Sequence, residues 1–355
     1  MKKWILLFGI FLTISVRIAC AASSSGVEIV YAEAVDYFEI MENLSAWHPG
    51  CDPVYRKTLK EKFIKTDKDE HWLEWYVSFR QKMHSEKVRK VNDKSLFGSA
   101  WEIKPDAFSV NFHTSTRPME ALKKIKRKLK KDDYVALGKF YEHFNSRIAE
   151  LVRVSATHAS RAKDWTTELK KAKIKNLFRK AVKFYAIPSN RLKKVRVALV
   201  WYPKSMEPSV SFSHQTVIVR MHPSIESSFS MERISREIMR FVSRNQSSGQ
   251  NTVVSSRVFS VCDPRDYFPP RDILEKPLAY IFGNIMVSET KNRKNFELHR
   301  QWSINPWVNV YAKMLFPLVK KTIKNKQTIM SDEFLNNASR LCNELVEVGK
   351  FLSVK

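Results

Sequence analysis

The clearest hydrophobic pattern in the chain lies between residues 231 and 244. Apolar side chains recur there at helical spacing, at Ile234, Ile238, Phe241 and Val242. Because positions three and four apart share a face of a helix, the stretch is predicted to be a buried amphipathic helix. Ser230 precedes it and is a suitable N-cap residue.

A different period precedes this helix. From residue 195 to 201, apolar residues recur at every second position, which is the signature of a strand. Residues 210–212 and 216–221 are two more predicted strands, and residues 27–31 are a fourth. We therefore expect a small sheet just before the amphipathic helix.

Helical spacing dominates the rest of the chain, so the predicted class is α+β, predominantly helical. Helices are expected over residues 35–44, 55–83, 118–152, 174–185 and 332–348, with further helices that begin near Asp164, Asp272 and Pro306. Residues 243–256 are rich in Ser, Asn and Gln and are predicted to form a loop. The expected organisation is a helical N-terminal region over residues 22–190, followed by a region over residues 191–355 that contains the sheet.

Two of these helices contain groups of large apolar residues. The spacing of Trp72, Trp75, Tyr76 and Phe79 indicates core packing rather than an exposed stacking surface. The second arm of the predicted hairpin over residues 118–152 is expected to bury its apolar residues, Val135, Leu137, Phe140, Tyr141 and Phe144. The basic run over residues 123–131 is interpreted as a solvated helix face, with an anion-binding patch as the alternative.

The first 21 residues have the pattern of a signal peptide. Lys2 and Lys3 precede an apolar run over residues 4–16, and small residues follow at Ala19 and Ala21. Cleavage is expected after Ala21, so the protein is predicted to be exported, either to the periplasm or out of the cell. The apolar run is shorter than the roughly 20 residues that a membrane helix needs, and no later segment resembles a membrane anchor.

Cleavage would leave three cysteines, Cys51, Cys262 and Cys342. An odd number leaves at least one thiol unpaired, and their wide spacing fits neither a zinc knuckle nor a disulfide framework. One disulfide is possible, for example between Cys51 and Cys262, but the sequence leaves the pairing open.

Composition limits the choice of partner. The chain is 44% hydrophobic, as expected for a packed globular protein, yet 62 Lys and Arg residues face 36 Asp and Glu residues, for a formal net charge of +26. Such a charge favours anionic partners, including nucleic acid, phospholipid surfaces and acidic polysaccharides. No helix-turn-helix, zinc finger or RNA-recognition motif is present, and no glycine-rich phosphate loop or CxxC motif occurs.

The predicted helix at residues 231–244 contains the candidate chemistry. Its central register reads Arg236-Glu237-Ile238-Met239-Arg240. In a zinc peptidase helix of the H-E-x-x-H type, two His residues four apart hold the metal and the Glu between them activates a water. A guanidinium has no lone pair to donate, so Arg236 and Arg240 cannot ligate zinc. A second carboxylate, Glu275, falls one turn before Leu278 on the apolar side of a later predicted helix.

The order of strands, motif helix and second helix resembles the gluzincin branch of zinc metallopeptidases. More closely, the chain is similar to a family of exported bacterial proteins predicted to be zinc-dependent peptidases. The matching segments are VEIVYAEAVDYFEIMENLS, KFYEHF, VRVALVWYP, SREIMRF and ILEKPLAYIFGN. The resemblance implies that Glu237 takes the general-base position and Glu275 that of the third ligand, while Arg236 and Arg240 replace the histidines. It therefore implies a degenerate member with no bound metal and no cofactor.

Three functions follow as alternatives. The first is a catalytically inactive metallopeptidase homologue that binds a partner, either a protein or another anionic molecule. The second is an active hydrolase whose metal is held by Glu237 and Glu275 with His214 or His222. The third is a basic protein that binds anionic polymers or membrane surfaces.

The arginines also admit two arrangements. In one, an inward guanidinium of Arg240 or Arg236 replaces the metal and binds Glu275 through two nitrogens, because a buried carboxylate needs a partner. In the other, both arginines point to solvent.

Overall fold

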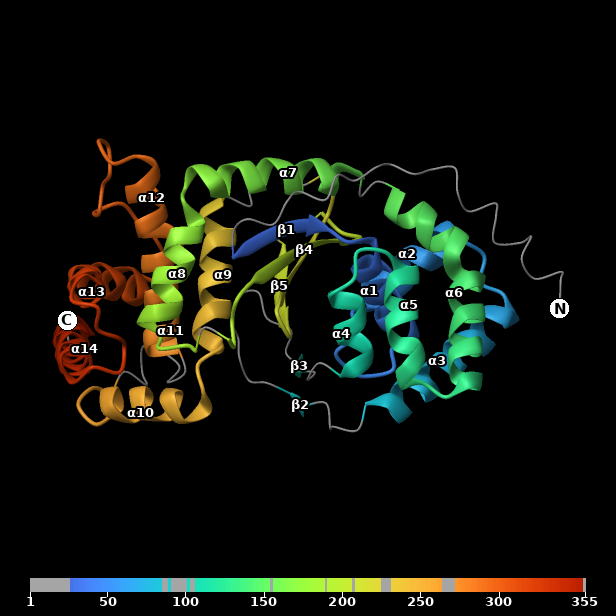
Figure 1. The fold of residues 1–355 in the computed structure, drawn as a ribbon, viewed down its shortest axis with the longest axis horizontal. Coiled ribbons are helices and arrows are strands. Elements are labelled where there is room, and N and C mark those ends of the chain that lie inside the picture. Colours follow the sequence, from blue (N-terminus) through green and yellow to red (C-terminus); the bar gives the residue numbers. More distant parts are fainter. Residues whose placement is uncertain are drawn as a thin grey trace.

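The computed structural model describes residues 26–84, 89–90, 101–102, 106–153, 156–188, 190–205, 208–224, 231–263 and 272–353. The predicted signal peptide and the predicted N-cap Ser230 lie outside these ranges. The described chain folds around a four-stranded sheet with helices on both faces, which confirms the predicted α+β class with predominantly helical content (Figure 1).

The sheet has the strand order β1-β4-β6-β5. Its strands are β1 (Val27–Tyr31), β4 (Val195–Trp201), β6 (Thr216–Met221) and β5 (Ser209–Ser213). All four were predicted, although β5 extends one residue beyond the predicted bounds at each end. Neighbours β1, β4 and β6 are parallel, whereas β5 at one edge is antiparallel to β6. The short β2 (Arg89–Lys90) and β3 (Trp101–Glu102) form a separate antiparallel pair. Because β1 pairs with β4, the sheet contains one strand from the region before residue 190 as well as three strands from the region after it.

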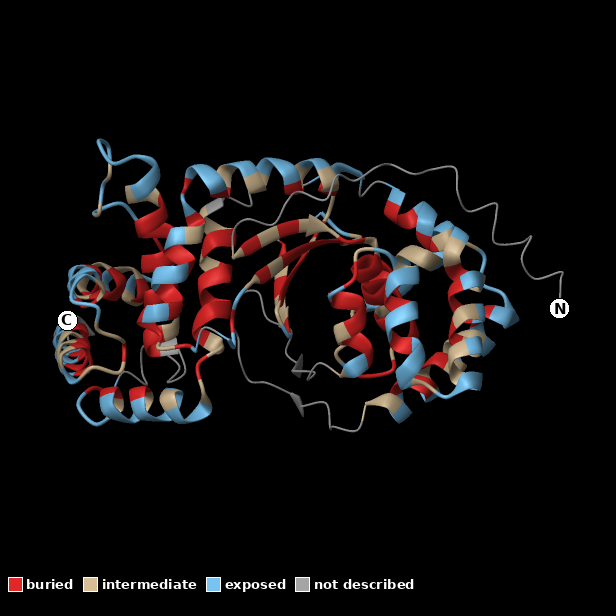
Figure 2. Ribbon diagram, viewed as in Figure 1, coloured by how far each residue is buried: buried red, intermediate tan, exposed pale blue. Residues whose placement is uncertain are grey.

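The first helical layer covers one face of the sheet. It consists of α1 (Glu33–Ser45), α2 (Pro53–Lys62), α3 (Asp67–Met83), α4 (Ala107–His113), α5 (Pro118–Ile125), a 3₁₀ turn (Lys126–Lys128) and α6 (Lys131–Val152). Its core is rich in aromatic rings, and buried residues of α1, α4 and α6 face one another in it (Figure 2). Tyr76 and Phe79 are buried, and the partly buried Trp72 and Trp75 pack on the same core, which confirms the predicted core packing.

The second helical layer lies on the other side of the sheet, with its first three helices against the strands. It consists of α7 (Ala156–Lys171), α8 (Ile174–Phe184), α9 (Met231–Arg244), α10 (Ser248–Phe259), α11 (Asp272–Tyr280), a π-helix (Ile281–Ile285), α12 (Met286–Lys291), α13 (Pro306–Lys324) and α14 (Asp332–Ser353). The larger of the two main cores lies here and includes Val195, Val197 and Leu199 from alternate positions of β4. None of the helices in the described ranges is both long and apolar enough to cross a membrane.

Several local predictions are wrong. The predicted loop over residues 243–256 contains most of α10, because Ser247 and Gln250 form a capping box instead of a turn, and Val254 is buried. Asp164 lies inside α7 and does not cap it. The predicted helix over residues 55–83 is divided into α2 and α3, since Thr66 caps a new helix. Val135 is 47% exposed, whereas the other four apolar residues predicted for α6 are buried.

The suggested disulfide between Cys51 and Cys262 is also wrong. Cys262 is bonded to Cys342, with their Cα atoms 5.9 Å apart, because α10 packs against α14. Cys51 belongs to the first helical layer and is free. Its thiol donates to the Glu42 carbonyl oxygen at 3.1 Å.

Candidate functional site

Helix α9 carries the residues of the predicted motif, and its burial follows the predicted pattern. The apolar stripe is no more than 3% exposed at any of its positions, Ile234, Ile238, Phe241 and Val242. The helix packs against α11, the π-helix and α8. These neighbours also cover the motif, so Glu237 is only 2% exposed and Arg240 only 7%.

Arg240 lies between two carboxylates that come from different helices. Its Nη1 donates to Glu237 Oε2 at 3.0 Å, one turn earlier on α9. Its Nε donates to Glu275 Oε1 on α11 at 3.2 Å. The inward ion pair expected for Arg240 is therefore present. It differs in detail from the expectation, because the guanidinium is shared between two carboxylates and does not bind Glu275 through two nitrogens.

Two more arginines extend the cluster along α9. Arg244 Nε donates to Glu275 Oε1 at 2.9 Å, and Arg236 Nε is 3.4 Å from Glu237 Oε1. Each carboxylate thus contacts Arg240 and one outer arginine. Arg244 was not among the predicted site residues, although the repeat of arginine at every fourth position from 236 to 244 indicates a shared helix face. We call these three arginines and two glutamates the arginine cluster.

Aromatic rings support both ends of the arginine cluster. The Arg236 guanidinium carbon lies 4.7 Å from the centre of the Tyr280 ring, and that of Arg244 lies 5.0 Å from the Phe212 ring. A guanidinium over an aromatic face is held by the ring's electron density. Because Phe212 belongs to β5, this contact also places the cluster beside the antiparallel edge of the sheet.

The spacing between α9 and the segment of Glu275 depends on a glycine. A Cβ atom added at Gly283, in the π-helix that follows α11, would lie 2.3 Å from Arg236 Cα. That distance is far below van der Waals contact, so a larger residue would push the two helices apart. Gly283 thereby allows the close backbone approach that brings Glu275 within reach of Arg240.

The five side chains of the arginine cluster differ in charge and in exposure. Three guanidiniums and two carboxylates leave a formal charge of +1. The outer arginines are the more accessible, with 13% of the Arg236 side chain and 26% of the Arg244 side chain exposed. The outer arginines are therefore the part of the cluster that a partner can reach.

The residues present do not fit a zinc ion. Both carboxylates are bound to protonated guanidiniums, which cannot ligate a metal. His214 is exposed in the turn between β5 and β6, and His222 Nδ1 lies 2.6 Å from Ser224 Oγ. In the part of the chain that the structure describes, no three His, Cys, Asp or Glu side chains are grouped as a metal site, so neither histidine joins Glu237 and Glu275 in one.

Two other buried ion pairs lie on the opposite face of the sheet and were missed in the sequence. Arg220 of β6 binds Glu39 of α1 through two nitrogens at 2.7 and 2.9 Å. Burial tends to raise the pKa of Glu39, but Arg220 and His113 together outweigh it and lower the pKa to about 2. Arg80 binds Glu42 in the same way and also donates to Asp106 at 2.8 Å. Unlike the arginine cluster, neither group has an excess of arginine.

Comparison with known proteins gives no further guide to the site. No protein-family model, curated protein or solved structure matches the chain. The functional assignment therefore rests on the chemistry and geometry of the residues themselves.

Proposed function

We propose that the protein is a catalytically inactive, zincin-like binding protein that is exported and acts on its partner without hydrolysing it. The observation that carries the proposal is the position of Arg240, whose guanidinium contacts both Glu237 and Glu275. These are the general-base and third-ligand positions under the resemblance to gluzincins. Arg240 then takes the place of both a histidine ligand and the positive charge of the metal.

This arrangement disfavours both metal binding and proton transfer from water, the two steps that a zinc peptidase needs. A divalent cation would have to displace Arg240 and approach two further arginines, with only two carboxylates to hold it. Glu237 also could not readily accept a proton from water, since Arg236 and Arg240 already occupy its two oxygens. The cluster therefore holds α9 and α11 together as an ion-pair network.

The same cluster supports a binding role. The exposed part of the Arg244 guanidinium favours a partner with carboxylate groups. The adjacent strand β5 is an edge of the sheet, where an extended polypeptide can add as a further strand. We infer that the partner is a protein segment with acidic side chains, bound along β5 next to Arg244.

Metal content tests the proposal. We expect purified protein to contain no stoichiometric zinc, and Arg236→His/Arg240→His to bind one zinc ion, because imidazoles four residues apart can share a metal. The matched control is Arg236→His/Arg244→His, whose imidazoles are eight residues and about 12 Å apart along the helix. Stoichiometric zinc in the unmodified protein, together with chelator-sensitive peptide cleavage, would overturn the proposal.

The net charge of +26 favours a second candidate function, general binding to anionic polymers. The two functions respond differently to Arg236→Gln/Arg244→Gln. Removal of two charges from +26 should change the salt-dependent retention on heparin only slightly. Binding of an acidic partner at the arginine cluster should instead be lost.

A further inference from the structure

A groove of about 290 Å³ lies between α2 and α3 in the first helical layer. Both helices pack against α1 rather than closely against each other, and Leu44 at the end of α1 lines the space between them. Ile64, in the loop that joins α2 to α3, also lines the groove. It is 90% exposed, more than any other large apolar residue in the described ranges. The groove therefore presents apolar surface that the protein itself leaves uncovered.

The two walls of the groove follow one pattern with opposite charge. On α2 the lining residues alternate between basic and apolar, at Arg56, Leu59, Lys60 and Phe63, where the helix ends. On α3 they alternate between acidic and apolar, at Glu70, Leu73, Glu74 and Val77. Because positions i, i+3, i+4 and i+7 share one face of a helix, each wall has an apolar row beside a charged row. The four apolar residues of the walls are all partly exposed.

Some of the charges on the walls have partners within the protein. Glu70 pairs with Lys65, and Arg56 Nε donates to the Leu44 carbonyl oxygen at 3.0 Å. Lys60 and Glu74 are exposed, and within the described ranges neither has an ion-pair partner. A molecule in the groove would therefore meet a positive charge on the α2 wall and a negative charge on the α3 wall.

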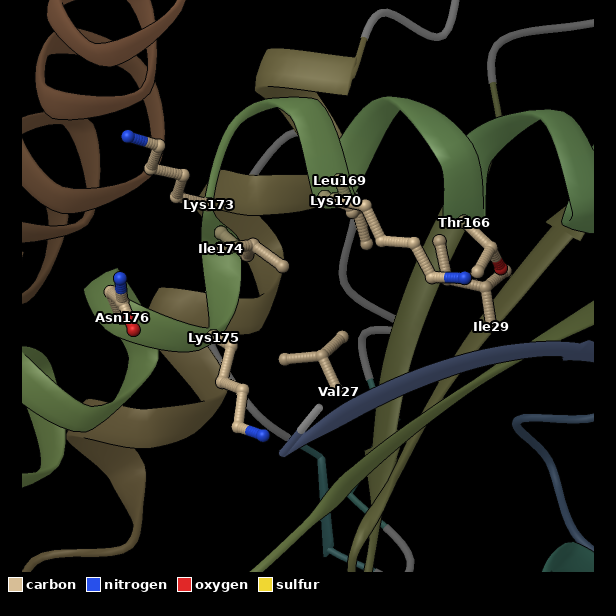
Figure 3. Close-up of a pocket in the computed structure, with 9 residues that line it drawn as sticks. All are labelled: Val27, Ile29, Thr166, Leu169, Lys170, Lys173, Ile174, Lys175 and Asn176. Atoms are coloured by element: carbon tan, nitrogen blue, oxygen red, sulfur yellow. The ribbon is translucent and has the colours of Figure 1, made fainter. Parts of the chain in front are cut away.

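Another cavity, of about 270 Å³, lies beside β1 where α7 meets α8, and its charges are arranged differently (Figure 3). Its charged lining residues are Lys170, Lys173 and Lys175. The ammonium groups of Lys170 and Lys175 lie on opposite sides of the apolar lining (Figure 3). That cavity therefore lacks the two facing rows of opposite charge that line the groove between α2 and α3.

We propose that the groove between α2 and α3 binds an amphipathic helix of a partner protein. The helix lays an apolar stripe on Leu59, Phe63 and Leu73, with acidic side chains along α2 and basic side chains along α3. Helices that pack in this way fill the seam with apolar residues and place ion pairs along its edges. The stripe on each wall is about 10 Å long, which corresponds to about two turns of a bound helix.

A second copy of the chain suits the groove less well than a different protein. Two molecules that each have a formal net charge of +26 repel one another. The groove shares no residue with the arginine cluster or with β5, so the inference does not rest on the proposed function.

Designed helical peptides test the charge pattern. Three peptides share one leucine stripe and carry glutamate on one flank and lysine on the other, glutamate on both, or lysine on both. Their binding to the full chain is measured by titration calorimetry. Glu74→Lys makes both walls basic, so it should shift the preference from the mixed peptide toward the all-glutamate peptide by about threefold or more. The matched control is Glu142→Lys, an equal change of charge at an exposed residue of α6 outside the groove, which should leave the preference unchanged.

Ile64→Ser tests the apolar contact without a change of charge. Because Ile64 is largely exposed, the variant should fold as the unmodified protein does, while its affinity for the mixed peptide falls about fivefold or more. Ile304→Ser is the matched control, since Ile304 is 76% exposed and lies outside the groove, and its affinity should not change.

Three results with the peptides would each overturn the proposal: no saturable binding of the mixed peptide, an unchanged preference in Glu74→Lys, or equal effects of Ile64→Ser and Ile304→Ser. Sedimentation analysis of the unmodified protein adds a fourth. A dimer that Ile64→Ser dissociates would show that a second copy, and not a partner helix, occupies the groove.

Discussion

Arg240 on α9 donates from Nε to Glu275 Oε1 on α11 over 3.2 Å, and this contact connects two helices through residues 35 positions apart in the chain. The same guanidinium binds Glu237, so one side chain compensates two carboxylates that are largely shielded from water. Removal of a charged group from such a network leaves its partners buried with less compensation. Substitution of Arg240 is therefore expected to lower the stability of the folded protein.

Arg240→Met should lower the free energy of unfolding by about 3 kcal/mol, measured by urea denaturation. We expect the lower end of the range for buried pairs, because Glu237 and Glu275 each keep a second arginine. Arg244→Met is the control, since 26% of that side chain is exposed, and it should lower stability by about 1 kcal/mol or less. Equal losses in the two variants would contradict a central role for Arg240.

Gly283→Ala should destabilise the protein, because the new methyl group would overlap the Arg236 backbone. Overpacking of this kind lowers stability by about 1–3 kcal/mol, which thermal or urea unfolding can measure. Gly138→Ala is a control with the opposite expected sign. Apart from the backbone of its own helix, nothing lies within 4 Å of the Cβ added in α6, so the loss of backbone freedom in the unfolded chain should raise stability by about 0.5–1 kcal/mol. A neutral Gly283→Ala would show that the helices can separate freely.

Cys342→Ser should lower stability by about 2–5 kcal/mol, since the disulfide to Cys262 closes a long loop in the unfolded chain. Cys51→Ser should leave this contribution intact, because Cys51 is free. Thermal unfolding of both variants, with and without reductant, measures the difference. A peptide that links Cys51 to Cys262 in a non-reduced digest of the unmodified protein would contradict the assignment.

Asp36→Asn should alter the pH dependence of stability. Full burial raises the pKa of Asp36 to about 8, although hydrogen bonds from the Trp201 N–H, at 2.6 Å from Oδ1, and from the Tyr31 side chain act in the opposite direction. The unfolded chain loses this proton near pH 4, so between roughly pH 4 and 8 the folded state binds more protons. Stability then falls as pH rises through this window, by at most about 1.4 kcal/mol per pH unit from this group.

Asparagine keeps the hydrogen-bond acceptor and does not titrate. The variant should therefore become more stable than the unmodified protein as pH rises, and urea unfolding at pH 5, 6, 7 and 8 measures the difference. Comparison of the two proteins cancels the contributions of other titrating groups, among them His158, whose pKa burial lowers to about 4. Parallel stability curves would contradict a protonated Asp36 in the folded state.

Several features were predictable because they depend on neighbouring residues. All four strands of the main sheet were predicted, β4 from the alternation of its apolar residues, and helical spacing identified the buried face of α9. The inward arginine was one of two arrangements that the sequence left open, and the contact between Arg240 and Glu275 decides between them. Helix α10 was missed because Ser and Gln suit loops and helix caps equally well, and only packing on α14 distinguishes the two.

The sequence by itself determined which faces are apolar, and that residues 236 and 240 have no lone pair for a metal, because both are properties of local spacing and side-chain chemistry. Only the tertiary structure decided that Arg240 bridges Glu237 and Glu275, that Arg244 joins them, and that Cys262 pairs with Cys342. The contacts to Glu275 and the disulfide join residues 31 to 80 positions apart. Local periodicity does not determine which residues so far apart in the chain come into contact. Contacts of this kind depend on how closely whole helices pack, and Gly283 sets that spacing for α9 and the π-helix.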